Sequence, residues 1–178
     1  MATKRTKSGQ GATSGTKSAG KAPGARGRKR LKLLVLSGPN LQRLGKREPD
    51  VYGRRTLDEI HAELEQVADG LGVDVDCRQS NYEGELVGWL GEAGDQGFSG
   101  VLINPGALTH YSYAVHDAIK ASGLPCVELH LSNPDAREEF RHVSVVAAVC
   151  VGRVAGFGAD SYRLALIGLV QKLASSKR

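Results

Sequence analysis

The chain has 178 residues, of which 40% are hydrophobic, and this suits one soluble domain with a sizeable core. No apolar run approaches the ~20 residues that a membrane-spanning helix needs, so we expect no such helix. The formal net charge is +5, but residues 1–30 hold nine Lys and Arg and no acid, so removing these nine charges leaves −4 for the rest.

Residues 1–30 contain no Leu, Ile, Val or aromatic side chain. Such a segment cannot bury enough apolar surface to offset the entropy of ordering, so we expect a disordered basic tail before a folded domain at residues 31–178. The tail could bind nucleic acid non-specifically, although a solvated extension is the favoured interpretation. Because it lacks the apolar stretch of a signal peptide, we expect a cytoplasmic protein.

Short apolar runs predict strands, and amphipathic patterns predict helices between them. The strands are predicted at residues 31–36, 73–78, 100–104, 125–130 and 143–151, and the helices at residues 56–71, 83–94, 112–121 and 160–175. This alternation is typical of an α/β domain with a doubly wound parallel sheet and helices on both faces.

The helix predicted at residues 56–71 has the clearest local signals. Thr56 and Glu59 have the spacing of a capping box. Apolar residues then recur at helical spacing, at Leu57, Ile60, Leu64, Val67 and Leu71. The last helix likewise has one apolar face, formed by Tyr162, Leu166, Leu169 and Leu173.

The three cysteines, Cys77, Cys126 and Cys150, are widely spaced and lie in or beside apolar runs. Free thiols in a reducing cytosol fit this pattern best. No Cys and His spacing resembles a zinc site, so we predict no metal.

Polar residues follow the predicted strands at their carboxyl ends, where open parallel sheets bind ligands. They include Asn40, Asn81, His110, Glu128, His130 and Ser132. Since these ends meet at one edge of the sheet, we expect the side chains to converge on one cleft.

Taken singly, these residues leave alternatives open. Glu128 and His130 point to the same face of a strand, where a carboxylate could fix the imidazole tautomer or form only a local ion pair. Residues 37–40, SGPN, could be a plain turn, because no phosphate-binding glycine motif follows. Arg137 and Arg141 are flanked by acids, which is typical of a solvated helix face. No lysine is placed for a Schiff base.

Five blocks of the sequence, taken in order, resemble type II 3-dehydroquinate dehydratase. They are LVLSGPNLQRLGKREPDVYGRRTLDEI, RQSNYEGELVGWL, VLINPGALTHYSYAVHDAI, VELHLSNPDAREEFRHVS and VAGFGADSYRLAL, within residues 33–173. The resemblance implies a flavodoxin-like fold, a homododecamer built as a tetramer of trimers, and neither a metal nor an organic cofactor. It also implies loss of water from 3-dehydroquinate to give 3-dehydroshikimate, in the shikimate pathway or in quinate breakdown.

The resemblance further implies a role for individual residues. Tyr52 matches the general base, Arg47 the arginine that stabilises it, and His130 the general acid. Asn40 matches a residue that holds a water or oxygen near the enolate. The implied substrate contacts are Asn104, His110 and Arg141, the backbone amides of Leu131 and Ser132, and Asp117, which reaches the site of a neighbouring subunit.

Some positions depart from the family pattern. Ser37 stands where Asn is usual, His116 where Arg is usual, and Pro134 begins a Pro-Asp pair in place of Val-His. These changes put subunit contacts and the fine geometry of the site in question. A binding module without turnover is the competing interpretation, and the joint presence of Tyr52, Arg47 and His130 argues against it.

Overall fold

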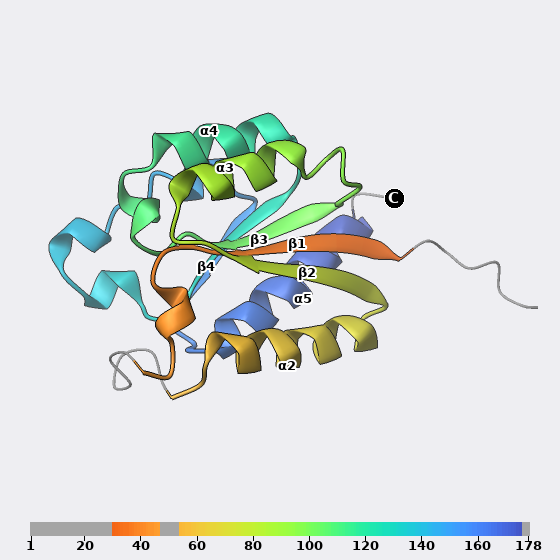
Figure 1. The fold of residues 1–178 in the computed structure, drawn as a ribbon, viewed down its shortest axis with the longest axis horizontal. Coiled ribbons are helices and arrows are strands. Elements are labelled where there is room, and N and C mark those ends of the chain that lie inside the picture. Colours follow the sequence, from red (N-terminus) through yellow and green to blue (C-terminus); the bar gives the residue numbers. More distant parts are fainter. Residues whose placement is uncertain (1–29, 47–53, 176–178) are drawn as a thin grey trace, which may run out of the picture.

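The computed structural model describes residues 30–46 and 54–175. In this part of the chain, five parallel strands form one sheet in the order β2-β1-β3-β4-β5 (Figure 1). The strands are β1 (Leu31–Ser37), β2 (Val73–Gln79), β3 (Gly100–Asn104), β4 (Cys126–His130) and β5 (Gly152–Ala155). The order changes direction between β1 and β3, which is the switch point where doubly wound sheets bind ligands. The predicted fold class is confirmed.

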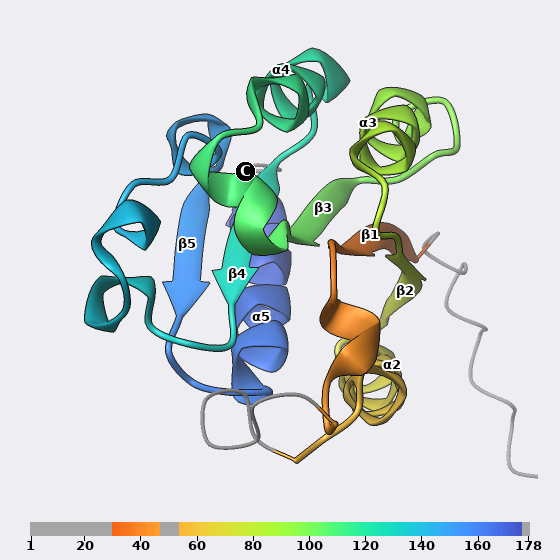
Figure 2. The same ribbon diagram turned by 60° about the vertical axis from the view of Figure 1, so that its left-hand side comes forward.

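Helices cover both faces of the sheet (Figures 1 and 2). On one face lie α2 (Leu57–Gly70) and α5 (Asp160–Ser175), and on the other lie α3 (Glu83–Glu92) and α4 (Tyr113–Ser122). Alternate residues of β1 point to opposite faces of the sheet and pack against different helices. Leu33 and Val35 pack in the cluster with α2 and α5, whereas Leu34 and Leu36 pack in the cluster with α3 and α4.

Side chains cap two of the helices. Thr56 Oγ1 accepts a hydrogen bond from the Glu59 backbone N at 3.3 Å, and the Glu59 carboxylate accepts one from the Thr56 backbone N at 2.8 Å, which confirms the predicted capping box. Ser112 Oγ accepts from the Val115 backbone N at 2.9 Å and starts α4. Each cap satisfies N–H groups that the first helical turn leaves without partners.

The strand predicted at residues 143–151 is wrong. This run contains the 3-10 turn η5 (Ala147–Val149), and the fifth strand begins only at Gly152. Ser144 Oγ starts the turn by accepting a hydrogen bond from the Ala147 backbone N at 2.9 Å. Val146 is fully buried in the cluster beneath α3 and α4. The run is therefore apolar because it covers the core, whereas β5 is a half-exposed edge strand with a more polar sequence.

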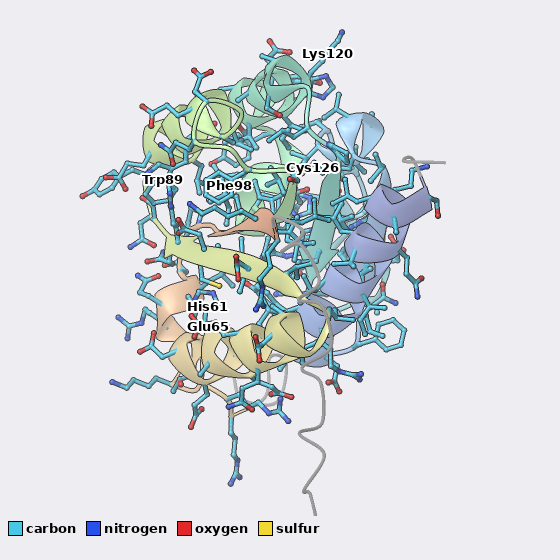
Figure 3. All side chains as sticks on the ribbon, turned by 90° about the vertical axis from the view of Figure 1, so that its right-hand side faces the viewer. His61, Glu65, Trp89, Phe98, Lys120 and Cys126 are labelled. Atoms are coloured by element: carbon cyan, nitrogen blue, oxygen red, sulfur yellow. The ribbon has the colours of Figure 1, made fainter. Side chains whose placement is uncertain are left out.

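The cysteines in the described part of the chain are free thiols, and Cys126 is buried between the sheet and the layer of α3 and α4 (Figure 3). Burial raises the pKa of the Cys77 thiol to about 12, which keeps it protonated and unreactive. Among the described helices, none is both long and apolar enough to cross a membrane.

Arg30, which the sequence places at the end of the basic tail, contacts the folded domain. Its guanidinium lies 3.0 Å from carboxylate oxygens of Asp69 and Asp74 and donates to the Val73 carbonyl at 2.8 Å. It thus links the start of β1 to the turn between α2 and β2. Residues 1–29 lie outside the described residues, so the predicted tail stays a prediction.

Candidate active site

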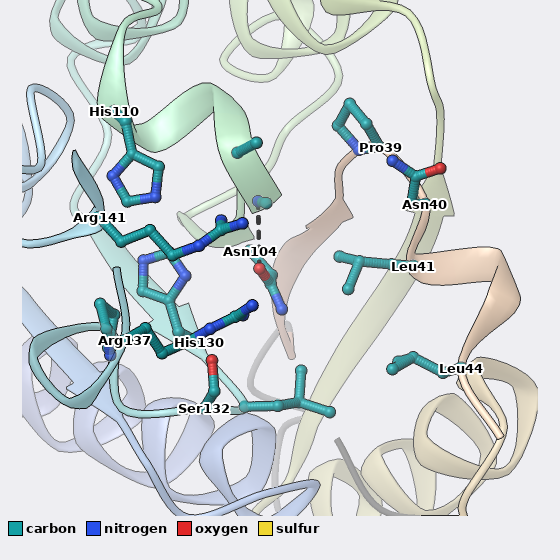
Figure 4. A pocket seen from close by; sticks show the side chains of 14 residues that line it. Pro39, Asn40, Leu41, Leu44, Asn104, His110, His130, Ser132, Arg137 and Arg141 are labelled. Atoms are coloured by element: carbon teal, nitrogen blue, oxygen red, sulfur yellow. Dashed lines mark hydrogen bonds between the residues drawn. The ribbon is translucent and has the colours of Figure 1, made fainter. Parts of the chain in front are cut away.

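A cavity of about 130 Å³ opens at the carboxyl ends of β1, β3 and β4 (Figure 4). Its described lining contains two arginines and two histidines and no acidic residue, which suits an anionic ligand. The lining residues are Pro39, Asn40, Leu41, Leu44, Asn104, Gly106, Ala107, His110, His130, Leu131, Ser132, Pro134, Arg137 and Arg141.

The turn after β1 brings Asn40 to the cavity. The Gly38 backbone N donates to the Asn104 carbonyl at 2.8 Å, and a Cβ on Gly38 would lie 2.6 Å from the Pro105 carbonyl oxygen, so only glycine fits here. Asn40 is the one described non-glycine residue with a positive φ, 68°, a conformation that Asn tolerates better than most residues. Its backbone N donates to Asn81 Oδ1 at 2.8 Å, which ties the ends of β1 and β2 together.

The amide of Asn104, at the end of β3, is held from two sides. Its Oδ1 accepts a hydrogen bond from the Gly106 backbone N at 3.2 Å (Figure 4), and its Nδ2 donates to the Tyr162 hydroxyl at 3.5 Å. Tyr162 in turn shares a hydrogen bond of 2.9 Å with Ser37 Oγ. Burial raises the pKa of Tyr162 to about 12, so its hydroxyl stays neutral and can accept from the amide. The orientation of Asn104 is therefore fixed by α5.

His130 and Glu128 form a buried pair on β4. His130 Nε2 lies 2.7 Å from Glu128 Oε1, while Glu128 is fully buried and His130 is 8% exposed. This contact assigns the Nε2 proton, because the carboxylate can only accept. Nδ1 is then the ring nitrogen left for the cavity. The predicted position of the carboxylate beside the imidazole is confirmed.

Two hydroxyls also contact the Glu128 carboxylate. Thr109 Oγ1 donates to Oε1, and Ser144 Oγ lies 3.0 Å from both oxygens. Burial raises the pKa of Glu128, but the hydrogen bonds from His130 and Thr109 outweigh it and hold this pKa below its ordinary value. Glu128 is therefore ionised, and its carboxylate accepts a hydrogen bond from the His130 ring.

His110 and Arg141 lie on the same side of the cavity as His130, opposite Asn40 and Leu41 (Figure 4). His110 Nδ1 donates to the Val143 carbonyl at 2.8 Å, which leaves Nε2 for a ligand. Burial lowers the pKa of His110 despite this bond, so the ring is neutral at physiological pH. Arg141 Nε is oriented by Glu138 Oε2 at 2.8 Å, and its guanidinium stacks 4.6 Å from the centre of the Phe140 ring.

The predicted convergence of strand-end residues on one cleft is confirmed for the ends of β1, β3 and β4, but not for the end of β2. Seven predicted site residues line the cavity: Asn40, Asn104, His110, His130, Leu131, Ser132 and Arg141. Asp117 does not line it, since it is exposed on α4. Tyr52 and Arg47 lie outside the described residues. Asn81 also does not line the cavity and contacts Asn40 instead.

Several residues of the site were not found from the sequence. Arg137 lines the cavity, although its acidic neighbours had favoured a solvated helix face. Thr109 and Ser144 hold Glu128, and Tyr162 holds Asn104, from elements distant in sequence. Only Thr109 carried a usable signal, because it directly precedes His110 after a strand end.

In the part of the chain that the structure describes, no group of three or more His, Cys, Asp and Glu could hold a metal ion. The predicted absence of a metal and of a cofactor stays a prediction.

The profile of the family described as Dehydroquinase class II matches residues 31–170. A curated 3-dehydroquinate dehydratase of Deinococcus radiodurans is 57% identical over 141 residues, which are 79% of this chain and 99% of the relative. A second curated relative of that name, from Thermus thermophilus, is 55% identical over 141 residues, 79% of this chain and 95% of the relative.

Solved structures agree with these matches. The crystal structure of a type II dehydroquinase from Propionibacterium acnes has a TM-score of 0.76 at 46% identity and covers 80% of this chain and 99% of that chain. The corresponding structure from Butyrivibrio crossotus has a TM-score of 0.77 at 41% identity, covering 79% of this chain and 97% of that chain.

Proposed function

The chain belongs to the class II dehydroquinase family, and we propose that it removes water from 3-dehydroquinate through an enolate, giving 3-dehydroshikimate. The activity makes it a carbon–oxygen lyase of the hydro-lyase class. The observation that carries the proposal is one cavity lined by His130, Asn104, Arg141 and their neighbours, with no acid among its described lining residues. The substrate is a carboxylate that bears a ketone and hydroxyls, and this lining offers cations and amide groups to such a molecule.

The first step removes the proton on the carbon α to the ketone, and we assign it to Tyr52. A phenol with a pKa of about 10 is a weak base at neutral pH. A guanidinium nearby favours the phenolate, and Arg47 has this role in our proposal. Loss of the proton leaves an enolate, and Asn40 supports a water or the oxygen that carries its charge. The left-handed backbone of Asn40 and its bond to Asn81 are consistent with a fixed position for this group.

The second step expels the hydroxyl, and we assign the proton that it needs to His130. The buried carboxylate of Glu128 at 2.7 Å stabilises the imidazolium, and Nδ1 remains to donate. The electrons of the enolate re-form the ketone, the carbon–oxygen bond to the hydroxyl breaks, and water leaves.

The other residues of the proposed site bind the substrate. We propose that the backbone amides of Leu131 and Ser132 hold its carboxylate, while Asn104, His110 and Arg141 bind its oxygens. In our proposal Asp117 serves the site of a neighbouring subunit in a homododecamer built as a tetramer of trimers. Its exposed position on α4 is compatible with such a contact. The enzyme would act in the cytoplasm, in the shikimate pathway or in quinate breakdown.

The test is the rise of enone absorbance when purified protein meets 3-dehydroquinate. We expect turnover without added metal, unchanged by a chelator and by borohydride added with the substrate. Inactivation by borohydride would show a Schiff base and contradict the mechanism. Binding of the substrate without any rise in absorbance would indicate a binding module.

A further inference from the structure

A guanidinium lies behind the carboxylate that supports the proposed acid. Arg153 on β5 pairs in register with Glu128 on β4, so the two side chains are on the same face of the sheet. Arg153 Nε is 3.9 Å from Glu128 Oε1. The three groups therefore follow one another in the order Arg153, Glu128, His130, and the guanidinium does not line the cavity.

Arg153 has an unusual environment. Its Nε and Nη2 are buried and have no hydrogen-bond partner among the described residues. Buried N–H groups without partners are costly, so a guanidinium in this place needs a compensating interaction. Glu128 is the described acid within ion-pair distance of it, and Glu128 is fully buried.

The contact acts through charge rather than through a hydrogen bond. Glu128 Oε1 already accepts hydrogen bonds from His130 Nε2 and from the Thr109 hydroxyl, and it lies 3.0 Å from Ser144 Oγ. At 3.9 Å the guanidinium is beyond hydrogen-bond distance but within strong Coulombic range, because little water separates the two groups.

We propose that Arg153 is a positioning residue that sets, through Glu128, how strongly the His130 acid holds its proton. The inference rests on the proposed function and adds a residue outside the cavity to it. Arg153 offsets part of the negative charge that stabilises the imidazolium, and its own positive charge repels the imidazolium as well. Both effects make His130 a stronger acid. The Arg153 charge also contributes to the lowered pKa of Glu128.

Other titratable, charged and polar groups face Glu128 and His130 and must stay unchanged in the test. His110 interacts electrostatically with both His130 and Glu128, and Arg141 lies near His110. Thr109 and Ser144 are neutral hydroxyls on Glu128. None of these is changed when only position 153 is varied.

The experiment compares the pH profile of kcat for wild type, Arg153→Met and Arg153→Lys. Removing the charge should move the basic limb of log kcat to higher pH by about one unit and lower the plateau roughly threefold, while the acidic limb stays in place. Lys should restore the wild-type profile, because a point charge suffices where no hydrogen bond is made. The matched control is Arg163→Met, which removes a half-exposed arginine that contacts Asp160 on α5.

A second readout does not need turnover. The titration of the His130 Cε1–H signal, assigned with His130→Asn, should move to higher pH in Arg153→Met and stay in place in Arg163→Met. This arm tests the coupling even if the protein were not a dehydratase. If Met unfolds the edge strand, Arg153→Gln replaces it. The proposal is overturned if Arg153→Met and Arg153→Gln leave both the basic limb of log kcat and the His130 titration in place. It is also overturned if Arg163→Met shifts them equally, or if Arg153→Lys does not restore the wild-type profile.

Discussion

Replacing Glu128 with Gln removes one charge from the centre of the site and keeps the shape of the side chain. The carboxylate lies 2.7 Å from His130 Nε2, and both groups are buried. A hydrogen bond to a charged group contributes about 1.5–3 kcal/mol, and about 1.4 kcal/mol is a factor of ten. We therefore expect kcat at a fixed pH above the basic limb to fall about 10- to 150-fold, because less of the acid is protonated there. Because the imidazolium loses its partner, the basic limb of log kcat should move down by about one to two pH units.

The assay is enone absorbance at saturating 3-dehydroquinate, measured from about pH 5 to pH 10 to cover both limbs. Thr109 and Ser144 can still donate to the amide oxygen, so the variant should fold, which circular dichroism checks. The matched control is Glu92→Gln at the exposed end of α3, where the carboxylate accepts a hydrogen bond from Gln96 Nε2 at 2.8 Å and lies away from the cavity. A Glu128→Gln enzyme with the kcat and basic limb of wild type would refute the pairing of Glu128 with the acid.

Tyr52→Phe should lower kcat by about 10²–10⁴-fold with little loss of substrate binding, since it removes the base, and the exposed Tyr82→Phe should change neither quantity. The pKa of Glu128 is lowered on folding, so its stabilisation is complete above the ordinary carboxyl pKa of about 4.3 and is lost as pH falls through the lower folded value. Urea midpoints should thus drop more steeply below about pH 4.3 in wild type than in Glu128→Gln; parallel curves would contradict this. Deleting residues 1–29 should leave kcat and Tm nearly unchanged, and a large drop in either would count against a solvated tail. Light scattering should give a dodecamer, and Asp117→Ala should lower activity; a fully active monomer would exclude a shared site.

Much of the fold follows from local patterns. The capping box at Thr56 and the apolar spacing of α2 need only neighbouring residues, and both are present in the structure. The strand predicted at residues 143–151 was wrong because an apolar run can pack on the core without adopting strand conformation. Val146 is buried in the core and Val145, Val149 and Cys150 pack partly buried against it, but the run forms a 3-10 turn, and β5 begins at Gly152.

The site residues that lie at the ends of strands could be predicted from the sequence. Asn104 and His130 are the last residues of buried strands, and the topology alone brings them together. The groups that orient them were not predictable in this way. Tyr162 reaches Asn104 from 58 residues away, and Arg153 meets Glu128 through strand pairing. Such contacts depend on which strands become neighbours, and no local pattern records that.

The central claim is that Tyr52 is the general base and His130 the general acid. Proton exchange tests this claim most directly. His130→Asn in D₂O should exchange the proton α to the ketone of 3-dehydroquinate with solvent, while it forms 3-dehydroshikimate very slowly. Tyr52→Phe should do neither, because no base forms the enolate. Nuclear magnetic resonance of the substrate follows both reactions in one sample. Exchange catalysed by Tyr52→Phe, or its absence in a folded His130→Asn enzyme that still binds substrate, would contradict the mechanism.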